Sequence, residues 1–457
     1  MLQNVMKIAI IGGGISGLSL AYKLRDLGHE IVIFEKNSIL GGRIQTYADD
    51  DNLVDQGAEF YIENNVYLRR LIKELNLIEE DYLSSKALID LKNSRSIILQ
   101  KKNDSWFTGL KKTLTMVKKY GIKELSSLKK LTTIGEAAER EINVFYNIME
   151  NSDIENVFEK LKSYFAESGK LNLTGYDYLS ELGISDNIIW NFVNPIVRNV
   201  YMTEIDKLPA YLVQLLLSLK DKGLYHVKGG NRILINALQE KLIDSNNVDI
   251  ITNAKVNEIM LSPTEDFIIG TEINKNMEIY KDFDFIYISG PLVNIPKIKF
   301  SHFGSSVNET LKQISEIRYN QFYHHYAKVS FNDNRIDELI SKGVDTIIPS
   351  DRISAIWELN IVKSEITHHY VDITSSYDLK TVKQNKLFTT FEIINSIAWK
   401  SAYPSYGVVD PNYFPNNHLF HSRIYFGTDN IISTMESSII QANKCVDYLQ
   451  TLEKIVI

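Results

Sequence analysis

The stretch K-I-A-I-I-G-G-G-I-S-G, residues 7–17, decides the fold of this chain. Its first five residues, Lys7–Ile11, form an apolar run typical of a buried parallel strand, and a helical pattern begins directly after the glycines. In this context Gly12 allows a tight turn, Gly14 lets the backbone approach a pyrophosphate, and Gly17 lets the helix pack on the sheet. The stretch therefore predicts a Rossmann-type dinucleotide site. The alternative is a structural glycine turn that binds no nucleotide.

The residues after the glycines complete the expected strand, helix and strand. Leu18, Ala21, Leu24 and Leu27 recur along one helical face, and Gly28 follows as a candidate C-cap. The amide groups of the first helical turn are expected to point at a bound anion.

A second strand ends in an acidic residue at the position that a dinucleotide site requires. Glu30–Phe34, E-I-V-I-F, is followed by Glu35, about 20 residues after the glycines. A carboxylate there accepts hydrogen bonds from a ribose and would repel a 2′-phosphate, which argues against NADP.

A second glycine motif distinguishes between the remaining dinucleotides. In Leu40–Thr46, L-G-G-R-I-Q-T, Gly42 lets the backbone approach a diphosphate and Arg43 can neutralise the diphosphate through its fork of donors. NAD sites lack this element, so the pair of motifs predicts FAD as the cofactor.

Composition fits an enzyme with a large buried cofactor. The chain has 457 residues, 44% of them hydrophobic and 11% aromatic, and a net charge of -7 that disfavours nucleic acid as a partner. One cysteine, Cys445, excludes an internal disulfide and favours a reducing compartment. The start runs straight into the first strand without a secretory pattern, so a cytoplasmic location is expected. The longest apolar run, around Tyr211–Leu219, is shorter than a membrane span and predicts a core helix.

The strand pattern is interrupted along the chain, which predicts an α/β protein with interleaved domains. A Rossmann-type FAD-binding domain is expected from residues 1–80, 223–295 and 403–457. An α+β substrate-binding domain with a helical insertion is expected from residues 81–222 and 296–402.

The C-terminal segment is a third candidate cofactor element. Tyr425–Asp429 reads as a strand ending in glycine and acid, and Ser433–Glu436 has the S-x-x-E pattern of a capping box that opens a helix. The apolar face of this helix is expected to contain Met435, Ile439, Ala442, Val446 and Leu449. Its N-terminal dipole would stabilise negative charge on a reduced flavin, whereas the alternative is an ordinary amphipathic helix.

The two glycine motifs and V-D-Q-G-A-E-F at Val54–Phe60 resemble the flavin amine oxidase superfamily. The resemblance implies that the backbone of Gly57–Phe60 runs beside the flavin ring and that Val256 contacts the adenine. The segments at 179–201 and 223–231, with W-K-S-A-Y-P at Trp399–Pro404, resemble prenylcysteine oxidases. The expected cofactor-binding residues are Gly12, Gly14, Ile15, Ser16, Gly17, Glu35, Lys36, Gly42, Arg43, Gly57, Ala58, Glu59, Phe60, Val256, Asp429 and Met435.

The resemblance implies oxidation of the carbon attached to sulfur in a thioether-linked isoprenoid. Flavin would accept a hydride, water would add to the carbon, and the product would collapse to an aldehyde and a thiol. Dioxygen would regenerate the flavin and give hydrogen peroxide. The expected partners are therefore a hydrophobic small molecule and dioxygen.

Few side chains are expected to take part in chemistry that the cofactor supplies. Lys328 matches the position at which many amine oxidases hold a water against the flavin, although it could be a lysine at a strand edge. Trp399 and Tyr403 are candidates for the wall of the substrate site, although buried aromatics are more often plain core. Tyr201 is a weaker substrate candidate, and Arg198 could bind a substrate carboxylate or form a structural ion pair.

A lysine-rich stretch could contact a membrane. Its apolar face and interspersed lysines are Trp106, Phe107, Leu110, Leu114 and Val117 with Lys111, Lys112, Lys118 and Lys119. Such a basic amphipathic helix can rest on anionic lipid, and the alternative is a helix packed on the core with solvated lysines. Four of the nine histidines form the adjacent pairs 324–325 and 368–369, which is poor metal spacing, so no metal site is expected.

Three functions remain open from the sequence. The first is an FAD oxidase of prenylcysteine-oxidase type, acting on a thioether or another hydrophobic substrate. The second is an amine oxidase or desaturase on the same scaffold. The third is a flavin-binding protein without turnover, since a fold does not fix the reaction.

Overall fold

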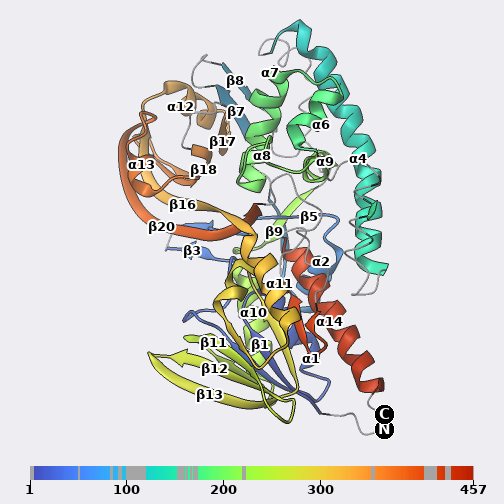
Figure 1. Cartoon of the computed structure of the whole chain (residues 1–457). Coiled ribbons are helices and arrows are strands. Elements are labelled where there is room, and N and C mark those ends of the chain that lie inside the picture. The colour runs from blue at the N-terminus through green and yellow to red at the C-terminus, as the bar shows by residue number, and fades with distance from the viewer. Residues whose placement is uncertain are drawn as a thin grey trace.

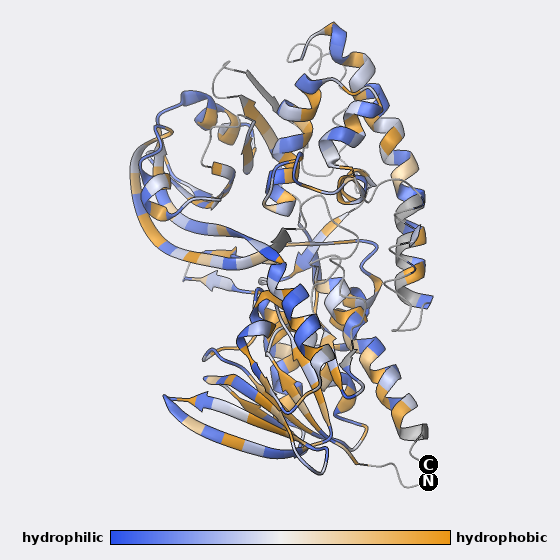
Figure 2. Ribbon diagram, in the orientation of Figure 1, coloured by the Kyte–Doolittle hydropathy of each residue, from blue (hydrophilic) through white to orange (hydrophobic). Residues whose placement is uncertain are grey.

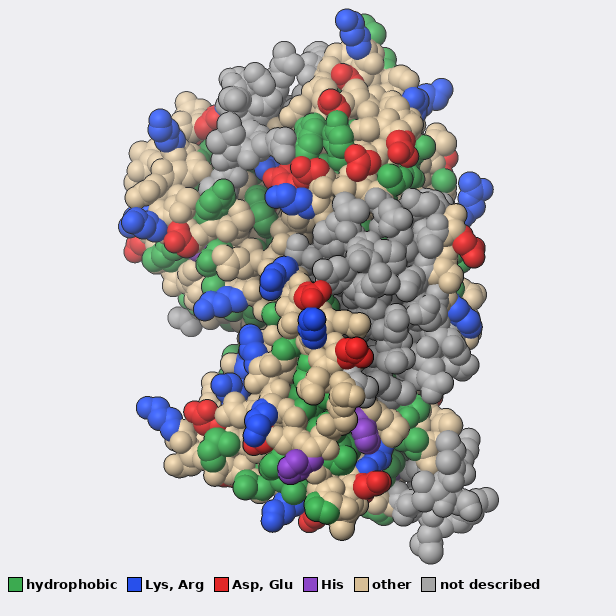
Figure 3. Space-filling model, viewed as in Figure 1, with side chains coloured by type: hydrophobic (Ala, Val, Ile, Leu, Met, Phe, Trp, Pro, Cys, Tyr) green, Lys and Arg blue, Asp and Glu red, His purple; other side chains and the backbone are tan. Residues whose placement is uncertain are grey.

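The structure is a computed structural model. It describes residues 5–49, 52–82, 86–90, 95–98, 120–151, 160, 163–164, 167, 173–218, 223–350, 356–405, 419–427 and 434–455. Two lobes are stacked along the long axis of the molecule, and a waist separates them on the face shown in Figure 3.

The lower lobe is built on a six-stranded sheet in the order β10-β2-β1-β14-β22-β21. The strands are β1 Lys7–Ile11, β2 Glu30–Phe34, β10 Val248–Ile251, β14 Phe285–Ser289, β21 Leu419–His421 and β22 Ile424–Gly427. The first five in sheet order are parallel and β21 is antiparallel. These strands are nearly all apolar, as Figure 2 shows, because both faces of the sheet are covered.

Helices cover one face of this sheet and a second sheet covers the other. The helices are α1 Ile15–Leu24, α10 Arg232–Ile243 and α14 Met435–Ile455. The second sheet has the order β13-β12-β11-β15, with β11 Ala254–Leu261, β12 Phe267–Ile273, β13 Asn276–Phe283 and β15 Lys299–Ser301. Ile8 and Ile10 pack toward the helices, whereas Ala9 and Phe34 pack toward the second sheet. Each fully buried Ile or Leu stabilises this layering by ~1.5–3 kcal/mol.

The upper lobe combines a seven-stranded sheet with a helical block (Figure 1). The sheet order is β20-β16-β19-β18-β17-β7-β8. Its strands are β7 Lys86–Asp90, β8 Arg95–Ile98, β16 Arg318–Phe331, β17 Thr346–Pro349, β18 Ile356–Ser364, β19 His369–Ser375 and β20 Phe388–Ser405. The helical block contains α4 Leu125–Asn151, α6 Gly175–Glu181, α7 Asp186–Ile188, the π-helix η3 Ile189–Val193, α8 Asn194–Tyr201 and α9 Ala210–Ser218.

Short elements connect and extend the lobes. Two small sheets, β3-β4 and β5-β9-β6, comprise β3 Thr46–Ala48, β4 Leu53–Asp55, β5 Tyr61–Ile62, β6 Glu79–Asp81 and β9 Leu224–Val227. The remaining helices are α2 Val66–Glu74, η2 Ile122–Glu124, η5 Leu292–Lys297, α11 Ser305–Glu316, α12 Asn334–Ser341 and α13 Leu379–Lys383.

The chain passes between the lobes more than once, as the interleaved reading expected. Strands of the lower parallel sheet come from three separated parts of the chain, and strands of the upper sheet come from two. The lower lobe continues beyond residue 295, since β15 joins β11 and Val307 and Ile314 of α11 pack in the lower core. The crossing into the upper sheet therefore lies near Ile317 rather than at residue 295.

Two helix predictions can be compared with the structure. The apolar run after Tyr211 is the core helix α9, and its Leu212 and Leu216 are buried in the helical block. Helix α1 ends at Leu24, so Gly28 is not its C-cap; Gly28 lies in the following turn with φ +81°.

The lysine-rich stretch around Trp106 lies outside the described residues. None of the helices in the described part of the chain is both long and apolar enough to cross a membrane.

Candidate active site

The first glycine motif adopts the expected turn, and each glycine has a different surrounding. Gly12 has φ +109°, and a Cβ there would lie 2.6 Å from the carbonyl oxygen of Ser289. A Cβ on Gly17 would lie 2.2 Å from the Gly12 carbonyl oxygen, so helix α1 can approach the turn only with glycine at this position. A Cβ on Gly14 would meet no atom of the described residues within 4 Å. The motif thus leaves open space at Gly14, where a ligand phosphate is expected.

The two glycine motifs lie side by side. Gly14 and Gly41 form a parallel bridge, and the Gly41 amide donates to the Gly13 carbonyl over 2.8 Å. Gly42 has φ +57°, and a Cβ there would lie 3.4 Å from Gly14 Cα. Both motifs therefore frame the same place at the N-terminus of α1, where unpaired helix amides favour an anion.

Ile15 and Ser16 form the first turn of α1. The Ser16 hydroxyl donates to the Gly427 carbonyl over 2.8 Å and also hydrogen-bonds the Tyr287 hydroxyl over 2.6 Å. These bonds tie α1 to β14 and β22. We therefore expect Ser16 to contact a phosphate through its backbone amide.

Glu35 is held at the end of β2 by backbone amides. Gly13 donates to Glu35 Oε2 over 2.9 Å and Asn37 donates to Oε1 over 2.8 Å. The Ala254 amide donates to the Glu35 carbonyl oxygen, which brings β11 and its buried Val256 to the same strand end. Lys36, the next residue, is exposed. Glu35 and β11 thus lie where a ribose and adenine would extend from the glycine motifs.

Arg43 reaches the opposite lobe. Its Nη1 donates to the Ala402 carbonyl on β20 over 2.7 Å, and its own carbonyl accepts from the Ala58 amide over 3.1 Å. A Cβ on Gly57 would lie 2.1 Å from that Arg43 carbonyl oxygen, so only glycine fits. Arg43 therefore joins Gly57 and Ala58 to the upper sheet, in addition to any contact with a diphosphate.

Asn231 fixes the backbone of the same segment. Its Nδ2 donates to the carbonyls of Ala58 and Glu59, each over 2.8 Å, and its Oδ1 accepts from the Val227 amide over 3.0 Å. The Asn231 side chain is almost fully buried. The sequence motif K-G-G-N therefore positions the segment that the resemblance places beside the flavin.

A buried acid and histidine cluster lies where this segment meets the upper sheet. His324 of β16 donates from Nδ1 to Asp372 Oδ2 of β19 over 2.8 Å, and its Nε2 lies 3.6 Å from Glu59 Oε1. Tyr82 donates its hydroxyl to Glu59 Oε2 over 2.5 Å. We call Glu59, His324 and Asp372 the buried triad.

Burial and mutual repulsion retain protons in the triad. Burial, reinforced by Glu358 and Asp372, raises the pKa of Glu59 to about 8, although His324 opposes the shift. Burial also raises the pKa of Asp55 to about 6. Burial alone would lower the pKa of His324, but the surrounding carboxylates, led by Asp372, outweigh burial and raise it.

An apolar group adjoins the triad. Phe322 lies edge-on to His324 with ring centroids 5.1 Å apart, and Phe322 packs with Trp357, Ala402, Met202 and Trp399. Trp399 donates Nε1–H to the Gln56 carbonyl over 2.8 Å, and its Cζ2 would lie 3.4 Å from a Cβ on Gly57. We call Gly57–Phe60 the flavin-side segment. Trp399, a candidate for the wall of the substrate site, therefore lies directly against this segment.

The sequence of the chain matches the family of flavin-containing amine oxidoreductases over residues 15–335. This chain belongs to that family. It is an FAD-dependent oxidoreductase.

The relatives agree with this membership. Prenylcysteine oxidase 1 from Homo sapiens is 25% identical over 470 residues, covering 96% of this chain and 87% of the relative. The 4,4'-diaponeurosporene oxygenase of Staphylococcus aureus is 25% identical over 298 residues, covering 61% of this chain and 57% of the relative.

Solved structures share the fold. Putrescine oxidase bound to putrescine superposes with a TM-score of 0.66 at 12% identity, covering 98% of this chain and 99% of the other. A putative protoporphyrinogen oxidase from Exiguobacterium gives 0.65 at 13% identity, with the same shares covered.

The residues at the glycine motifs fit FAD. Gly14 leaves room for a phosphate that a Cβ would fill, the amides of α1 supply donors, and Glu35 is a buried carboxylate in the ribose position. The segment Gly57–Phe60 lies between these motifs and the upper sheet. When bound, FAD supplies a two-electron acceptor for oxidation of a substrate C–H bond.

Lys328 lies away from the buried triad. Lys328 is four residues beyond His324 on β16, and its Nζ lies over the Tyr370 ring, 5.8 Å from the centroid, as does Lys363 Nζ at 5.6 Å. At a strand rise of ~3.3 Å per residue, Lys328 begins ~13 Å from His324. The strand position that faces Glu59 belongs to His324, and the catalytic role of Lys328 stays a prediction.

The other predicted residues have varied outcomes. Tyr201 is buried in the helical block and donates its hydroxyl to the Leu212 carbonyl, so it packs as core, whereas its neighbour Met202 reaches the apolar group. Arg198 makes structural contacts. It donates to the Pro349 carbonyl over 3.0 Å and lies 4.0 Å from the Glu204 carboxylate.

Tyr403 and Phe60 can be placed only in part. The backbone of Tyr403 pairs with Asn320 on β16, and the Tyr403 side chain lies outside the described part. The Phe60 ring stacks on Tyr82 with centroids 5.2 Å apart, next to the triad.

The C-terminal helix begins differently from the expectation. Asp429 and Ser433 lie outside the described residues. Thr434 precedes α14, and its Oγ1 accepts from the Ser437 amide over 3.1 Å. Met435 is buried at the first helical position. The Glu436 carboxylate accepts from the amides of Tyr67 and Leu68 at the start of α2.

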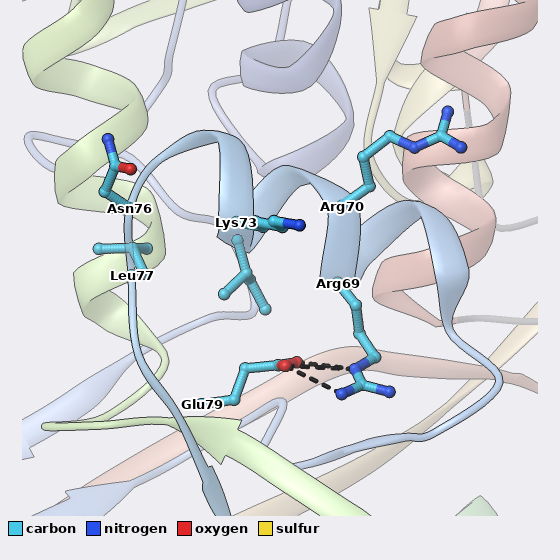
Figure 4. A pocket seen from close by; sticks show the side chains of 7 residues that line it. Arg69, Arg70, Lys73, Asn76, Leu77 and Glu79 are labelled. Carbon is cyan, nitrogen blue, oxygen red and sulfur yellow. Dashed lines mark hydrogen bonds and ion pairs between the residues drawn. The ribbon is translucent and has the colours of Figure 1, made fainter.

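A separate cavity of about 630 Å³ lies beside α2 (Figure 4). It is lined by Arg69, Arg70, Ile72, Lys73, Asn76, Leu77 and Glu79. Arg69 is already paired with Glu79 over 2.9 Å. None of these lining residues belongs to the cofactor motifs or to the triad, so we assign the cavity no part in the reaction.

Sequence reasoning missed His324, Asp372, Glu358, Trp357 and Phe322. His324 was considered only as half of an adjacent pair. Because neighbouring strand residues point to opposite faces, His325 turns away to Ser396 and Tyr377 while His324 faces Asp372.

Proposed function

We propose that this chain is an FAD-dependent oxidase that cleaves a thioether in a hydrophobic, prenylcysteine-like substrate. The observation that carries the proposal is the extent of the match with prenylcysteine oxidase 1, which covers 96% of the chain and therefore both lobes. The family match alone, ending at residue 335, leaves β17–β20 uncovered.

The proposed net reaction consumes a thioether, water and dioxygen. The S-bound CH₂ loses a hydride and gains the oxygen of water, the C–S bond breaks, and the products are an aldehyde, a thiol and hydrogen peroxide. Two electrons leave the substrate carbon and reduce dioxygen, so the equation is balanced.

The side chains near Gly57 support a hydrophobic substrate. Phe322, Trp357, Ala402, Met202 and Trp399 form a continuous apolar group against this segment. Such a surface can hold an isoprenoid and exclude bulk water from the reacting carbon. The roles of these residues are positioning and exclusion of water, since FAD supplies the chemistry.

The buried acids support a second candidate, oxidation of an amine. Glu59, Asp372, Glu358 and Asp55 interact electrostatically around His324. A cationic amine would be attracted by such a cluster once its carboxyl groups are ionised. The proton that Glu59 retains near neutral pH weakens this attraction, so the thioether comes first.

Aerobic turnover of farnesylcysteine, with farnesylamine as the matched amine, tests the proposal. The expected result is aldehyde, free cysteine and peroxide in equal amounts from farnesylcysteine, with farnesylamine left unoxidised. Oxidation of farnesylamine alone would replace the thioether reading with the amine reading. A flavin that neither compound reduces would favour a flavin-binding protein without turnover.

A further inference from the structure

We propose that His324 takes the proton from the water that adds to the oxidised substrate carbon, with Glu59 as the second group that holds this water and Asp372 as the positioning residue. The inference deepens the proposed thioether cleavage and rests on it.

The geometry leaves one nitrogen of His324 available. Its Nδ1 is used by the 2.8 Å bond to Asp372, and a carboxylate accepts, so Nδ1 carries the proton. Nε2 is then the proton acceptor, and no hydrogen-bond partner for it is found in the described part of the chain. His324 is 1% exposed, so leaving Nε2 without a partner is costly unless a small polar molecule uses it.

Glu59 is placed to share that molecule. The 3.6 Å between His324 Nε2 and Glu59 Oε1 is too long for a direct hydrogen bond. Two polar atoms at this spacing are suited to a water that contacts both. Glu59 is fixed from behind by the Tyr82 hydroxyl on Oε2, which leaves Oε1 directed to His324.

The site adjoins the place where the reacting carbon is expected. Phe322 connects His324 to Trp399 within the apolar group, and Trp399 lies against Gly57. Glu59 lies two residues after Gly57, and its backbone carbonyl accepts a hydrogen bond from Asn231. Glu59 of the triad therefore comes from the flavin-side segment, and His324 and Asp372 come from the upper sheet.

The proton and electron accounting is complete. After hydride loss the substrate carbon is doubly bonded to a positively charged sulfur. The water oxygen forms a C–O bond, the C=S pair moves to sulfur, and the water proton passes to His324 Nε2. The hemithioacetal hydroxyl then gives its proton to solvent as the C=O bond forms, and the C–S pair leaves with sulfur. His324 passes the proton that it took from water to this sulfur, so the thiol leaves neutral and His324 is again a base.

The surrounding charges strengthen His324 as a base. Asp372, Glu59 and Glu358 all raise the pKa of His324, and they face it from β19, the flavin-side segment and β18. Asp55 and Tyr82 complete the ionisable groups that act on Glu59 and its neighbours. A histidine backed by a carboxylate is the usual means of stabilising the imidazolium that proton transfer creates.

A metal ion explains the cluster less well. Ligand atoms of Glu59, His324 and Asp372 all lie within 4.8 Å of one another. Because the Asp372 bond occupies Nδ1, His324 offers only Nε2, and two protein ligands then remain, fewer than a zinc site uses. We therefore assign the triad to proton transfer and not to metal binding.

Stopped-flow spectroscopy of the FAD-loaded protein with farnesylcysteine separates the two steps. In anaerobic single turnover, flavin bleaching reports hydride loss and a thiol reagent reports C–S cleavage. For His324→Gln we expect bleaching within about twofold of the unaltered protein and thiol release slower by ~100-fold or more. His325→Gln is the matched control, since His325 is the next residue on the opposite face, and we expect both rates to be retained.

Histidine NMR gives a readout that does not depend on turnover. In the FAD-loaded protein labelled at histidine, the His324 resonance, identified by its loss in His324→Gln, should titrate with a pKa above 6.5. Asp372→Asn should lower that pKa and move the rising limb of the thiol-release profile to lower pH. A purely structural Asp372 would shift neither.

The outcomes that overturn the inference are distinct from failure of the proposed function. Unchanged thiol release in His324→Gln, or equal slowing of bleaching and release, would overturn the role of His324. A His324 pKa at or below 6.5 would also overturn it, whatever the substrate. Failure of farnesylcysteine to bleach the unaltered protein would instead remove the proposed function, and the water step with it.

Discussion

Two glycines three residues apart are required for different physical reasons. Gly17→Ala places a methyl 2.2 Å from the Gly12 carbonyl, so we expect the free energy of unfolding to fall by ~1–3 kcal/mol. Gly14→Ala meets no protein atom and has an ordinary φ of -80°, so unfolding in the absence of FAD should change by less than ~0.5 kcal/mol.

The effect of Gly14→Ala is expected in cofactor binding and not in the stability of the FAD-free chain. For Gly14→Ala, FAD affinity should fall on the order of tenfold or more, because the methyl occupies the space left for phosphate. Chemical denaturation of the FAD-free chain and a fluorescence titration with FAD measure the two effects. Full FAD affinity in Gly14→Ala would contradict the placement of the phosphate.

The buried acids predict how stability depends on pH. The folded chain raises the pKa of Glu59 from 4.5 to about 8 and that of Asp55 from 3.8 to about 6. The folded state therefore binds protons more tightly than the unfolded state, and this stabilisation is full below about pH 4 and is lost as pH rises through 6 and then 8. The melting temperature of the FAD-free chain should fall across this range.

Glu59→Gln should flatten the upper part of that pH dependence, between about pH 6 and 8. Glu309→Gln, which changes an exposed carboxylate on α11, is the control and should leave the slope unaltered. A slope that Glu59→Gln leaves intact would show that Glu59 is ionised in the folded chain.

Lys328 provides a test of strand position. Because its Nζ lies over Tyr370 and away from the triad, we expect Lys328→Met to leave anaerobic flavin reduction and aerobic reoxidation within about twofold of the unaltered rates. Stopped-flow measurement of both half-reactions checks this. A tenfold loss in either would restore the role that the family resemblance implied.

At the residue scale, local patterns were predictable and the triad was not. The glycine motifs and Glu35 are local in sequence, so their spacing predicts their roles, whereas the role of Gly57–Phe60 is implied by the family resemblance. His324, Asp372 and Glu59 are brought together only by the pairing of β16 with β19 and by the crossing of the flavin-side segment. No spacing rule relates residue 59 to residue 372.

At the scale of elements, Asn231 links α10 and β9 to the flavin-side segment. Asn231→Ala would leave two carbonyls and the Val227 amide without their buried partner, so we expect the free energy of unfolding to fall by ~2–3 kcal/mol. FAD affinity should fall as well, because Ala58 and Glu59 lose their anchor.

The control for Asn231 lies on the same helix. Asn236 is exposed and accepts a hydrogen bond from Arg232, so Asn236→Ala should change stability by less than ~0.5 kcal/mol. Denaturant titrations of both variants make the comparison. Equal effects would mean that Asn231 contributes only helix propensity.

Helix termini show where element prediction reaches its limit. The apolar spacing of α14 was read correctly, and Ile439, Ala442 and Leu449 are buried. The S-x-x-E pattern did not predict that Glu436 accepts from the first turn of α2, which is close only in the folded chain. A capping pattern names the side chains available, and tertiary contacts decide which amides they satisfy.

At the scale of the whole molecule, the site exists only where the two lobes meet. Arg43 and Gly57 come from the cofactor lobe, and Trp399, His324 and Asp372 come from the upper sheet. The interleaved chain order could be predicted because strand patterns stop and resume. The late crossing near Ile317 could not, because β15 and α11 lack a distinctive sequence motif.

The most direct test of the central claim is an anaerobic titration of the purified, FAD-loaded protein with farnesylcysteine. We predict that the flavin absorbance bleaches in proportion to added substrate and that one thiol is released for each flavin reduced. A flavin band that farnesylcysteine leaves unchanged at saturating concentration would contradict thioether oxidation as the function of this chain.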